Sequence, residues 1–257
     1  MSILYRVENG VAVLEIYRPE VKNALNQEMY AALNRGLASA AQDDAVRSLL
    51  IMGQPGAFCA GNELTEFVNN PPTDADSPVL RFMFALSRFE KPVIAAVTGH
   101  AVGIGATLLL HCDLVYVGAS ARLSMPFVKL GLVPEFAASL LLPQRAGSLR
   151  ASEVLLLSQP IAAEEAVAMG LANQVVPDEQ VVDVAREVAE RFNALPPEGV
   201  RDTKRLLKES QRRPVEDRIL EEARLFGARL GGPEVREAVA AFFEKREPDF
   251  SRVANED

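Results

Sequence analysis

Residues 91–107 read KPVIAAVTGHAVGIGAT and combine a strand, a turn and the start of a helix in one short segment. Residues 93–97 are apolar and uncharged, which predicts a buried strand. The glycine-rich residues that follow turn the chain into an apolar segment, residues 103–112, which predicts a helix. Because the first N–H groups of a helix are unpaired and carry partial positive charge, this turn could hold a negatively charged oxygen atom.

The N-terminal side continues the alternation of strands and helices. Residues 3–7 and 11–17 are β-rich and flank Asn9-Gly10, a pair that favours a type I′ turn, so they predict a hairpin. Residues 27–41 have apolar side chains at helical spacing, and residues 48–52 form a second buried strand. An α/β fold is expected.

The C-terminal side changes character after Leu149. Successive helices are expected there, with one short strand at residues 174–176, and Pro196-Pro197 then interrupts the chain. The expected helices lie at residues 150–158, 162–169, 178–194, 199–210, 215–230 and 233–246. We therefore divide the chain into a core, residues 1–195, and a helical region, residues 196–257.

Composition excludes several classes of protein. The net charge of −8 disfavours binding to nucleic acid or to an anionic membrane, and no apolar run approaches the ~20 residues that cross a bilayer. The two cysteines lack the spacing of a zinc or redox site, so no metal is expected. We expect a cytoplasmic enzyme with a sizeable core.

A second turn has properties similar to those of the first. Residues 54–64 follow the strand at 48–52, and their small side chains allow close approach of a ligand to the backbone. An ordinary loop with Asn62 as a helix N-cap is the alternative. Dinucleotide binding at the first turn is disfavoured, because Leu108 stands where its third glycine belongs.

Several motifs in fixed order give the chain a recognisable pattern over nearly its whole length. They are RP at 18–19, NALN at 23–26, AFCAGN at 57–62, KPVIAAVTG at 91–99, CDL at 112–114 and FFEKR at 242–246. With these motifs the chain resembles the crotonase (enoyl-CoA hydratase/isomerase) superfamily. The resemblance implies an α/β crotonase spiral of ββα units with a C-terminal helical oligomerisation region. It also implies a homotrimer or a dimer of trimers acting on acyl-CoA, with coenzyme A as part of the substrate and no separate cofactor.

The resemblance also implies which residues hold the substrate. The oxyanion hole corresponds to the backbone amides of Asn62 and Ile104, and because the family often has glycine at the second position, Ile104 could narrow the pocket. Lys245 would reach a coenzyme phosphate from a neighbouring subunit. The other expected acyl-CoA contacts are Arg18, Lys22, Ala24, Ala60, Gly61, Leu64, Gly103, Phe127, Leu132 and Pro134.

The carboxylates distinguish between reactions. Hydratases of the family use two glutamates, and the matching positions here hold Thr107 and Phe127, neither of which can transfer the required protons. Glu135 follows Pro134 in an apolar neighbourhood that should raise its pKa, and one carboxylate suffices to move a double bond. The chain looks most like the peroxisomal-type Δ3,Δ2-enoyl-CoA isomerases. A hydratase with an unconventional base and a non-catalytic acyl-CoA-binding protein are the alternatives.

Overall fold

The chain begins with the hairpin that Asn9-Gly10 predicts. In the computed structural model, which describes residues 2–54, 56–63, 66 and 76–253, strands β1 (Ile3–Glu8) and β2 (Val11–Ile16) pair antiparallel. Asn9 and Gly10 have φ angles of 48° and 72°, and a type I′ turn requires positive φ at both of its central residues. The predicted hairpin is confirmed.

A larger sheet extends from this hairpin. Parallel strands β3 (Ser48–Met52), β5 (Val93–Val97), β7 (Leu114–Gly118) and β10 (Gln174–Val176) add to β2. Among the described residues the sheet has six strands in the order β1-β2-β3-β5-β7-β10. Strands β3, β5 and β10 have the bounds that the sequence predicts.

A smaller sheet lies beside the first and consists of β4 (Ala57–Cys59), β6 (His100–Val102), β8 (Arg122–Ser124) and β9 (Ile161–Ala162). Strands β4, β6 and β8 each follow a strand of the large sheet and pair in parallel. Gly99 makes the step from β5 to β6 with φ 63°, and a Cβ atom there would overlap the Gly56 carbonyl. This recurrence of two strands and a helix is the predicted crotonase spiral.

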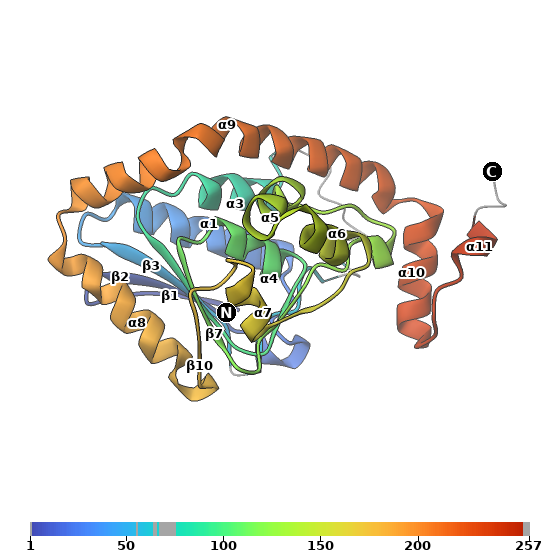
Figure 1. Cartoon of the computed structure of the whole chain (residues 1–257), viewed down its shortest axis with the longest axis horizontal. Coiled ribbons are helices and arrows are strands. Elements are labelled where there is room, and N and C mark those ends of the chain that lie inside the picture. Colours follow the sequence, from blue (N-terminus) through green and yellow to red (C-terminus); the bar gives the residue numbers. More distant parts are fainter. Residues whose placement is uncertain (1, 55, 64–65, 67–75, 254–257) are drawn as a thin grey trace.

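Helices cover both faces of the large sheet (Figure 1). Helices α1 (Gln27–Gln42) and α3 (Pro78–Ser87) pack against each other in the main core, and α8 (Val181–Arg191) covers the other face. Because side chains alternate along a strand, Leu49 enters the main core, whereas Leu50 packs under α8. Both faces of the parallel strands are therefore buried, as their unbroken apolar runs predict.

Short elements complete the spiral and the C-terminal region. They are η1 (Pro19–Val21), α4 (Ile104–Thr107), η2 (Leu108–His111), η3 (Val128–Leu130), α5 (Ala138–Ala146), α6 (Ser148–Leu156), α7 (Ala163–Ala168), η4 (Asp178–Gln180), η5 (Phe192–Ala194), α10 (Pro233–Glu244) and α11 (Phe250–Val253). The helix expected at residues 103–112 is thus one α-helical turn followed by a 3₁₀ turn.

The helical region differs from the prediction in one respect. The helices expected at residues 199–210 and 215–230 form a single long helix, α9 (Pro197–Leu230), which crosses the top of the molecule in Figure 1. Pro214 lies inside α9 and is exposed, so the carbonyl group that loses its hydrogen bond can face water. Two separate helices were therefore the wrong prediction.

Asp113 fastens α9 to the sheet. Its carboxylate accepts a hydrogen bond from the Val93 amide at 2.8 Å and pairs with Lys204 Nζ at 2.6 Å and Lys208 Nζ at 2.7 Å. The cluster is partly buried, with 19% of the Asp113 side chain and 10% of the Lys204 side chain exposed. Asp113 therefore has a structural role, because it joins α9 to the start of β5.

Candidate active site

The two glycine-containing turns predicted to hold an oxyanion lie against each other. Strands β4 and β6, which precede them, are parallel neighbours. Gly61 has φ 94°, and a Cβ atom on it would lie 3.1 Å from the Val102 carbonyl oxygen; a Cβ atom on Gly103 would lie 3.9 Å from Gly61 Cα. Glycine at position 61 allows this close approach, and glycine at position 103 suits the φ angle of 55° there.

The amides of Asn62 and Ile104 are left available by this arrangement. The Leu25 amide donates to the Gly61 carbonyl, and the Glu63 amide donates to the Leu25 carbonyl. This pairing uses the Gly61 carbonyl and the Glu63 amide and leaves the Asn62 amide between them free of it. Ile104 is the first residue of α4, where an N–H group has no partner within the helix. Neither amide donates a hydrogen bond to another group in the described part of the chain.

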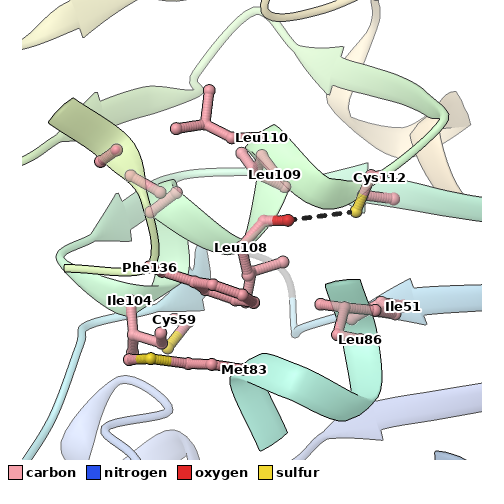
Figure 2. Packing of buried hydrophobic residues seen from close by; sticks show 14 of the residues in the cluster. Ile51, Cys59, Met83, Leu86, Ile104, Leu108, Leu109, Leu110, Cys112 and Phe136 are labelled. Atoms are coloured by element: carbon pink, nitrogen blue, oxygen red, sulfur yellow. Dashed lines mark hydrogen bonds between the residues drawn. The ribbon is translucent and has the colours of Figure 1, made fainter. Parts of the chain in front are cut away.

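The side chain of Ile104 belongs to the core. It is fully buried, and Figure 2 shows it beside Cys59, Met83 and Phe136. The next residue, Gly105, packs so closely on β4 that a Cβ atom there would lie 2.7 Å from the Cys59 carbonyl oxygen. Ile104 therefore positions its own amide by packing, and its side chain joins the hydrophobic cluster.

Tyr30 supports the turn that contains Gly61 and Asn62, and it was not predicted from the sequence. Its hydroxyl donates to Asn62 Oδ1 at 2.5 Å, and its ring, fully buried on α1, lies 5.7 Å from the ring of Phe82. The sequence shows Tyr30 only as one apolar position of a helix. Its contact with Asn62 depends on how α1 packs, which no local pattern reveals.

The loop expected to meet coenzyme A lies alongside the turn that contains Gly61. Ala60 donates to the Lys22 carbonyl at 3.0 Å, and Asn23 Nδ2 donates to the Ala57 carbonyl at 2.8 Å. Arg18 donates to Glu63 Oε2 at 2.5 Å and to the Ala24 carbonyl at 3.3 Å, so its guanidinium is already engaged within the protein. Lys22 is exposed, with φ 51°.

The remaining predicted contacts are only partly brought together. Phe127 is buried, with one ring atom 4.0 Å from the position of a Cβ on Gly103, and Leu132 donates to its carbonyl at 2.9 Å. Pro134 is half-buried and precedes Glu135. Leu64 lies outside the described residues.

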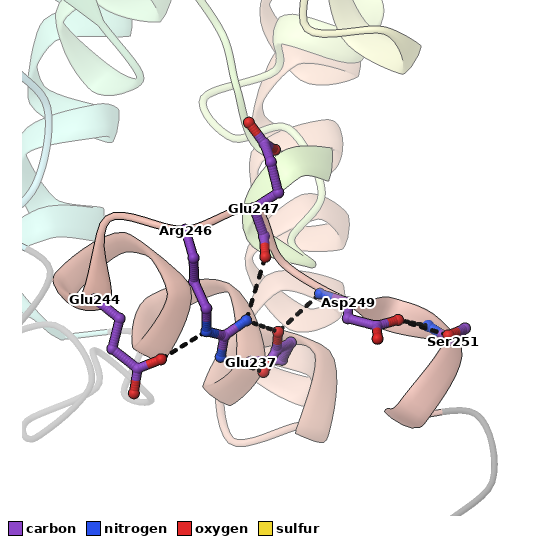
Figure 3. Close-up of polar contacts among 6 residues, drawn as sticks. All are labelled: Glu237, Glu244, Arg246, Glu247, Asp249 and Ser251. Carbon is purple, nitrogen blue, oxygen red and sulfur yellow. Dashed lines mark hydrogen bonds and ion pairs between the residues drawn. The ribbon is translucent and has the colours of Figure 1, made fainter.

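Lys245 lies at the C-terminal end of α10 and is exposed, in a left-handed conformation with φ 55°. The next residue, Arg246, is held in place within the same region: it pairs with Glu237 and Glu244, as Figure 3 shows. Helix α10 itself packs against η3, beside Phe127 of the same chain. Gly131, which follows η3, is so close to α10 that a Cβ atom on it would lie 2.8 Å from Glu234 Cβ.

Glu135 carries the buried carboxyl group that was expected to act as the base. Only 5% of the residue is exposed, and Oε1 has no partner among the described residues. Burial, followed by the negative charge of Glu222, raises its pKa from an ordinary value of 4.5 to about 8. The predicted upward shift is confirmed, and Glu222 is a contributor that the sequence did not indicate.

The two hydratase positions are also buried. Thr107 is fully buried, and its hydroxyl oxygen has no hydrogen-bond partner within the described residues. His111, the nearest histidine along the chain, is buried, which lowers its pKa to about 3 and keeps the ring neutral. It is thus unsuited to acid–base work near neutral pH.

An open cleft of about 700 Å³ lies elsewhere, between the first half of α9 and the ends of α3, η2 and α5. Arg88, Arg145, Lys204 and Lys208 are among its lining residues, and none of the residues expected to bind acyl-CoA lines it. The described residues contain no group of His, Cys, Asp and Glu side chains suited to a metal, and no described helix is long and apolar enough to cross a membrane.

Comparison with known proteins assigns the fold and the paired turns to a family. The family description "Enoyl-CoA hydratase/isomerase" matches residues 6–253. This chain belongs to the enoyl-CoA hydratase/isomerase family. The family acts on acyl-CoA, and its name covers both hydration and isomerisation.

Three relatives show how far the similarity extends. The chain is 38% identical to 1,2-epoxyphenylacetyl-CoA isomerase of Escherichia coli (strain K12), covering 97% of this chain and 98% of that protein. It is 32% identical to human enoyl-CoA delta isomerase 2, covering 95% of this chain and 64% of the human protein. The solved structure of Pseudomonas aeruginosa OdaA is 48% identical, with a TM-score of 0.92 over 94% of this chain and 98% of that one.

Proposed function

We propose that the protein is an enoyl-CoA isomerase that moves a double bond from the 3- to the 2-position, with Glu135 as its single acid–base group. The observation that carries this proposal is the buried carboxyl group of Glu135, whose Oε1 has no hydrogen-bond partner among the described residues. A buried polar group of this kind lowers the stability of the fold, so its presence calls for an explanation. Proton transfer explains it, because a carboxyl group of raised pKa is suited to that role.

The reaction requires no water and no metal. Ionised Glu135 removes a proton from C2 of a 3-enoyl thioester, and the C–H electron pair moves toward the carbonyl to give a dienolate. The amides of Asn62 and Ile104 donate to the negative thioester oxygen. Glu135, now protonated, returns the proton to C4, where the electrons of the C3–C4 double bond form the new C–H bond. The electrons of the C1–C2 bond of the dienolate move to C2–C3, the thioester carbonyl reforms, and the carboxylate of Glu135 is regenerated.

The raised pKa suits this chemistry. A carboxylate with a pKa of about 8 is a stronger base than an exposed glutamate, so it removes a weakly acidic C–H proton more readily. The same pKa keeps a large fraction of the group protonated near neutral pH, and we expect kcat/KM to rise with pH through about 8.

Coenzyme A would lie along the loop beside the turn that contains Gly61. We propose that Lys22, which is exposed there, meets a phosphate, and that the backbone near Ala24, Ala60 and Gly61 lies beside the coenzyme. Arg18 serves mainly to hold this loop, because its guanidinium pairs with Glu63. Phe127, Leu132 and Pro134 would border the acyl group.

Hydration is the less favoured reaction. Thr107 and Phe127 occupy the positions of the two hydratase glutamates, and Phe127 cannot transfer a proton. A second candidate is rearrangement of a ring-bearing acyl-CoA, because a relative that is 38% identical is a 1,2-epoxyphenylacetyl-CoA isomerase.

A panel of substrates tests the proposal. Purified protein is incubated with 3-enoyl-CoA and 2-enoyl-CoA esters of several chain lengths and with 1,2-epoxyphenylacetyl-CoA, and conjugation, hydration and rearrangement are followed separately. Conjugation of the 3-enoyl esters without hydration is the expected result. Hydration without conjugation would overturn the proposal, and rearrangement alone would favour the second candidate.

A further inference from the structure

The turn that carries Glu135 is strained. Phe136 and Ala137 have φ angles of 60° and 57°, so two consecutive residues with side chains adopt the left-handed conformation. Such residues are strained, and this conformation persists only where its surroundings hold it. The groups that hold the turn therefore decide where the carboxyl group of Glu135 points.

One group acts from the interior of the spiral. His111 Nε2 lies 2.8 Å from the Phe136 carbonyl oxygen, and because the ring is neutral, its N–H can donate to that oxygen. The imidazole also stacks on the Phe136 ring with 3.8 Å between centroids. His111 thus fixes the middle of the turn from η2.

A second group comes from α9. Glu222 is 4% exposed, and its Oε1 accepts hydrogen bonds from the Ser139 amide at 2.9 Å and the Ser139 hydroxyl at 2.5 Å. Its other oxygen, Oε2, is buried and has no hydrogen-bond partner among the described residues. Helix α5 has no capping side chain of its own at Ala137, so Glu222 supplies the cap from a distant part of the chain.

We propose that Glu222 is a positioning residue for the acid–base group: by capping α5 it holds the strained turn that presents Glu135. This inference rests on the proposed function of Glu135. Glu222 is 87 positions away in the sequence from Glu135, on the helix that crosses the molecule, so α9 contributes to the site without touching the reacting atoms.

Glu222 also acts on Glu135 through its charge. The titratable groups that face Glu135 are Glu222 from α9, Tyr30 from α1 and Cys59 from β4. Arg218, one turn before Glu222, donates to the Ser139 hydroxyl at 3.1 Å. Burial raises the pKa of Glu222, and the hydrogen bonds from Ser139 oppose this shift. When Glu222 is ionised, its negative charge raises the pKa of Glu135.

Two substitutions separate the cap from the charge. Glu222→Gln keeps an acceptor oxygen and removes the charge, so the pH at which kcat/KM is half-maximal should move below the wild-type value. Glu222→Ala removes the cap as well, and we expect kcat to fall ~10²-fold with little change in KM, because the turn no longer fixes Glu135. Asp217→Asn, which removes an exposed charge of α9 that pairs with exposed Arg213, is the matched control and should resemble the wild type.

The carboxyl titration of Glu135, followed by ¹³C NMR in the wild type and in Glu222→Gln, gives a readout that does not depend on activity. A lower midpoint in the variant supports the proposal. An unchanged midpoint together with an unchanged pH profile overturns it, whether or not Glu222→Ala folds. If the wild-type enzyme does not isomerise 3-enoyl-CoA, the proposed function fails, and the NMR midpoint still decides whether Glu222 controls Glu135.

Discussion

Glu135 is a buried carboxyl group held in a strained turn. Its Oε1 is unpaired among the described residues, and the next two residues are left-handed. Natural proteins place such costs at functional sites, where a pre-positioned group gains more in catalysis than it loses in stability. Because of this cost, the ionisation of Glu135 can be followed by the free energy of unfolding as well as by the reaction rate.

The raised pKa of Glu135 predicts how stability depends on pH. In the unfolded chain the carboxyl group ionises near its ordinary value of 4.5, whereas in the folded chain it keeps its proton to about 8. Between these values the folded state binds more protons, so its contribution to the free energy of unfolding falls with rising pH, by roughly 1.4 kcal/mol per unit. Below about 4.5 the penalty is absent.

Glu135→Gln removes this titration. The variant should therefore be more stable than the wild type at pH 8 and closely similar to it at pH 4. Urea unfolding at both pH values measures the difference, with Asp217→Asn as an exposed control. An equal stability difference at the two pH values would contradict the raised pKa.

At the scale of elements, the strands and turns were predictable because their signals are local. Residues 93–97 form a strand because they are all apolar and are followed by the turn residues Thr98-Gly99. Asn9-Gly10 makes the hairpin turn because both residues tolerate positive φ. Helix α9 was predicted as two helices, and a proline such as Pro214 usually breaks a helix. The helix continues here because the carbonyl group that loses its hydrogen bond can face water, which the sequence does not show.

The candidate site was predictable only in part for a related reason. The turns at Gly61 and Gly103 and the carboxylate of Glu135 stand out by residue type and order, and the family resemblance gives them their expected roles. Tyr30 and Glu222 do not stand out, because each looks like an ordinary helical position. Their importance arises from contacts between elements that are distant in the sequence, which only the folded chain reveals.

At the scale of the whole molecule, the C-terminal helices leave large apolar side chains exposed. Leu206, Leu207, Phe242 and Phe243 are each more than half exposed. Such a surface is typical of association, and we propose that the protein forms a homotrimer or a dimer of trimers. Size-exclusion chromatography with light scattering should give three or six times the chain mass of 27.9 kDa, and the mass of a monomer would be the contrary result.

The central claim is that Glu135 alone moves the proton, and the turnover of Glu135→Gln tests it most directly. The variant keeps the shape of the side chain and cannot act as a base. We predict that its kcat for conjugation of 3-enoyl-CoA falls ~10²–10⁴-fold, while its Kd for a non-reacting acyl-CoA stays near that of the wild type. A kcat equal to that of the wild type, with binding intact, would contradict the claim.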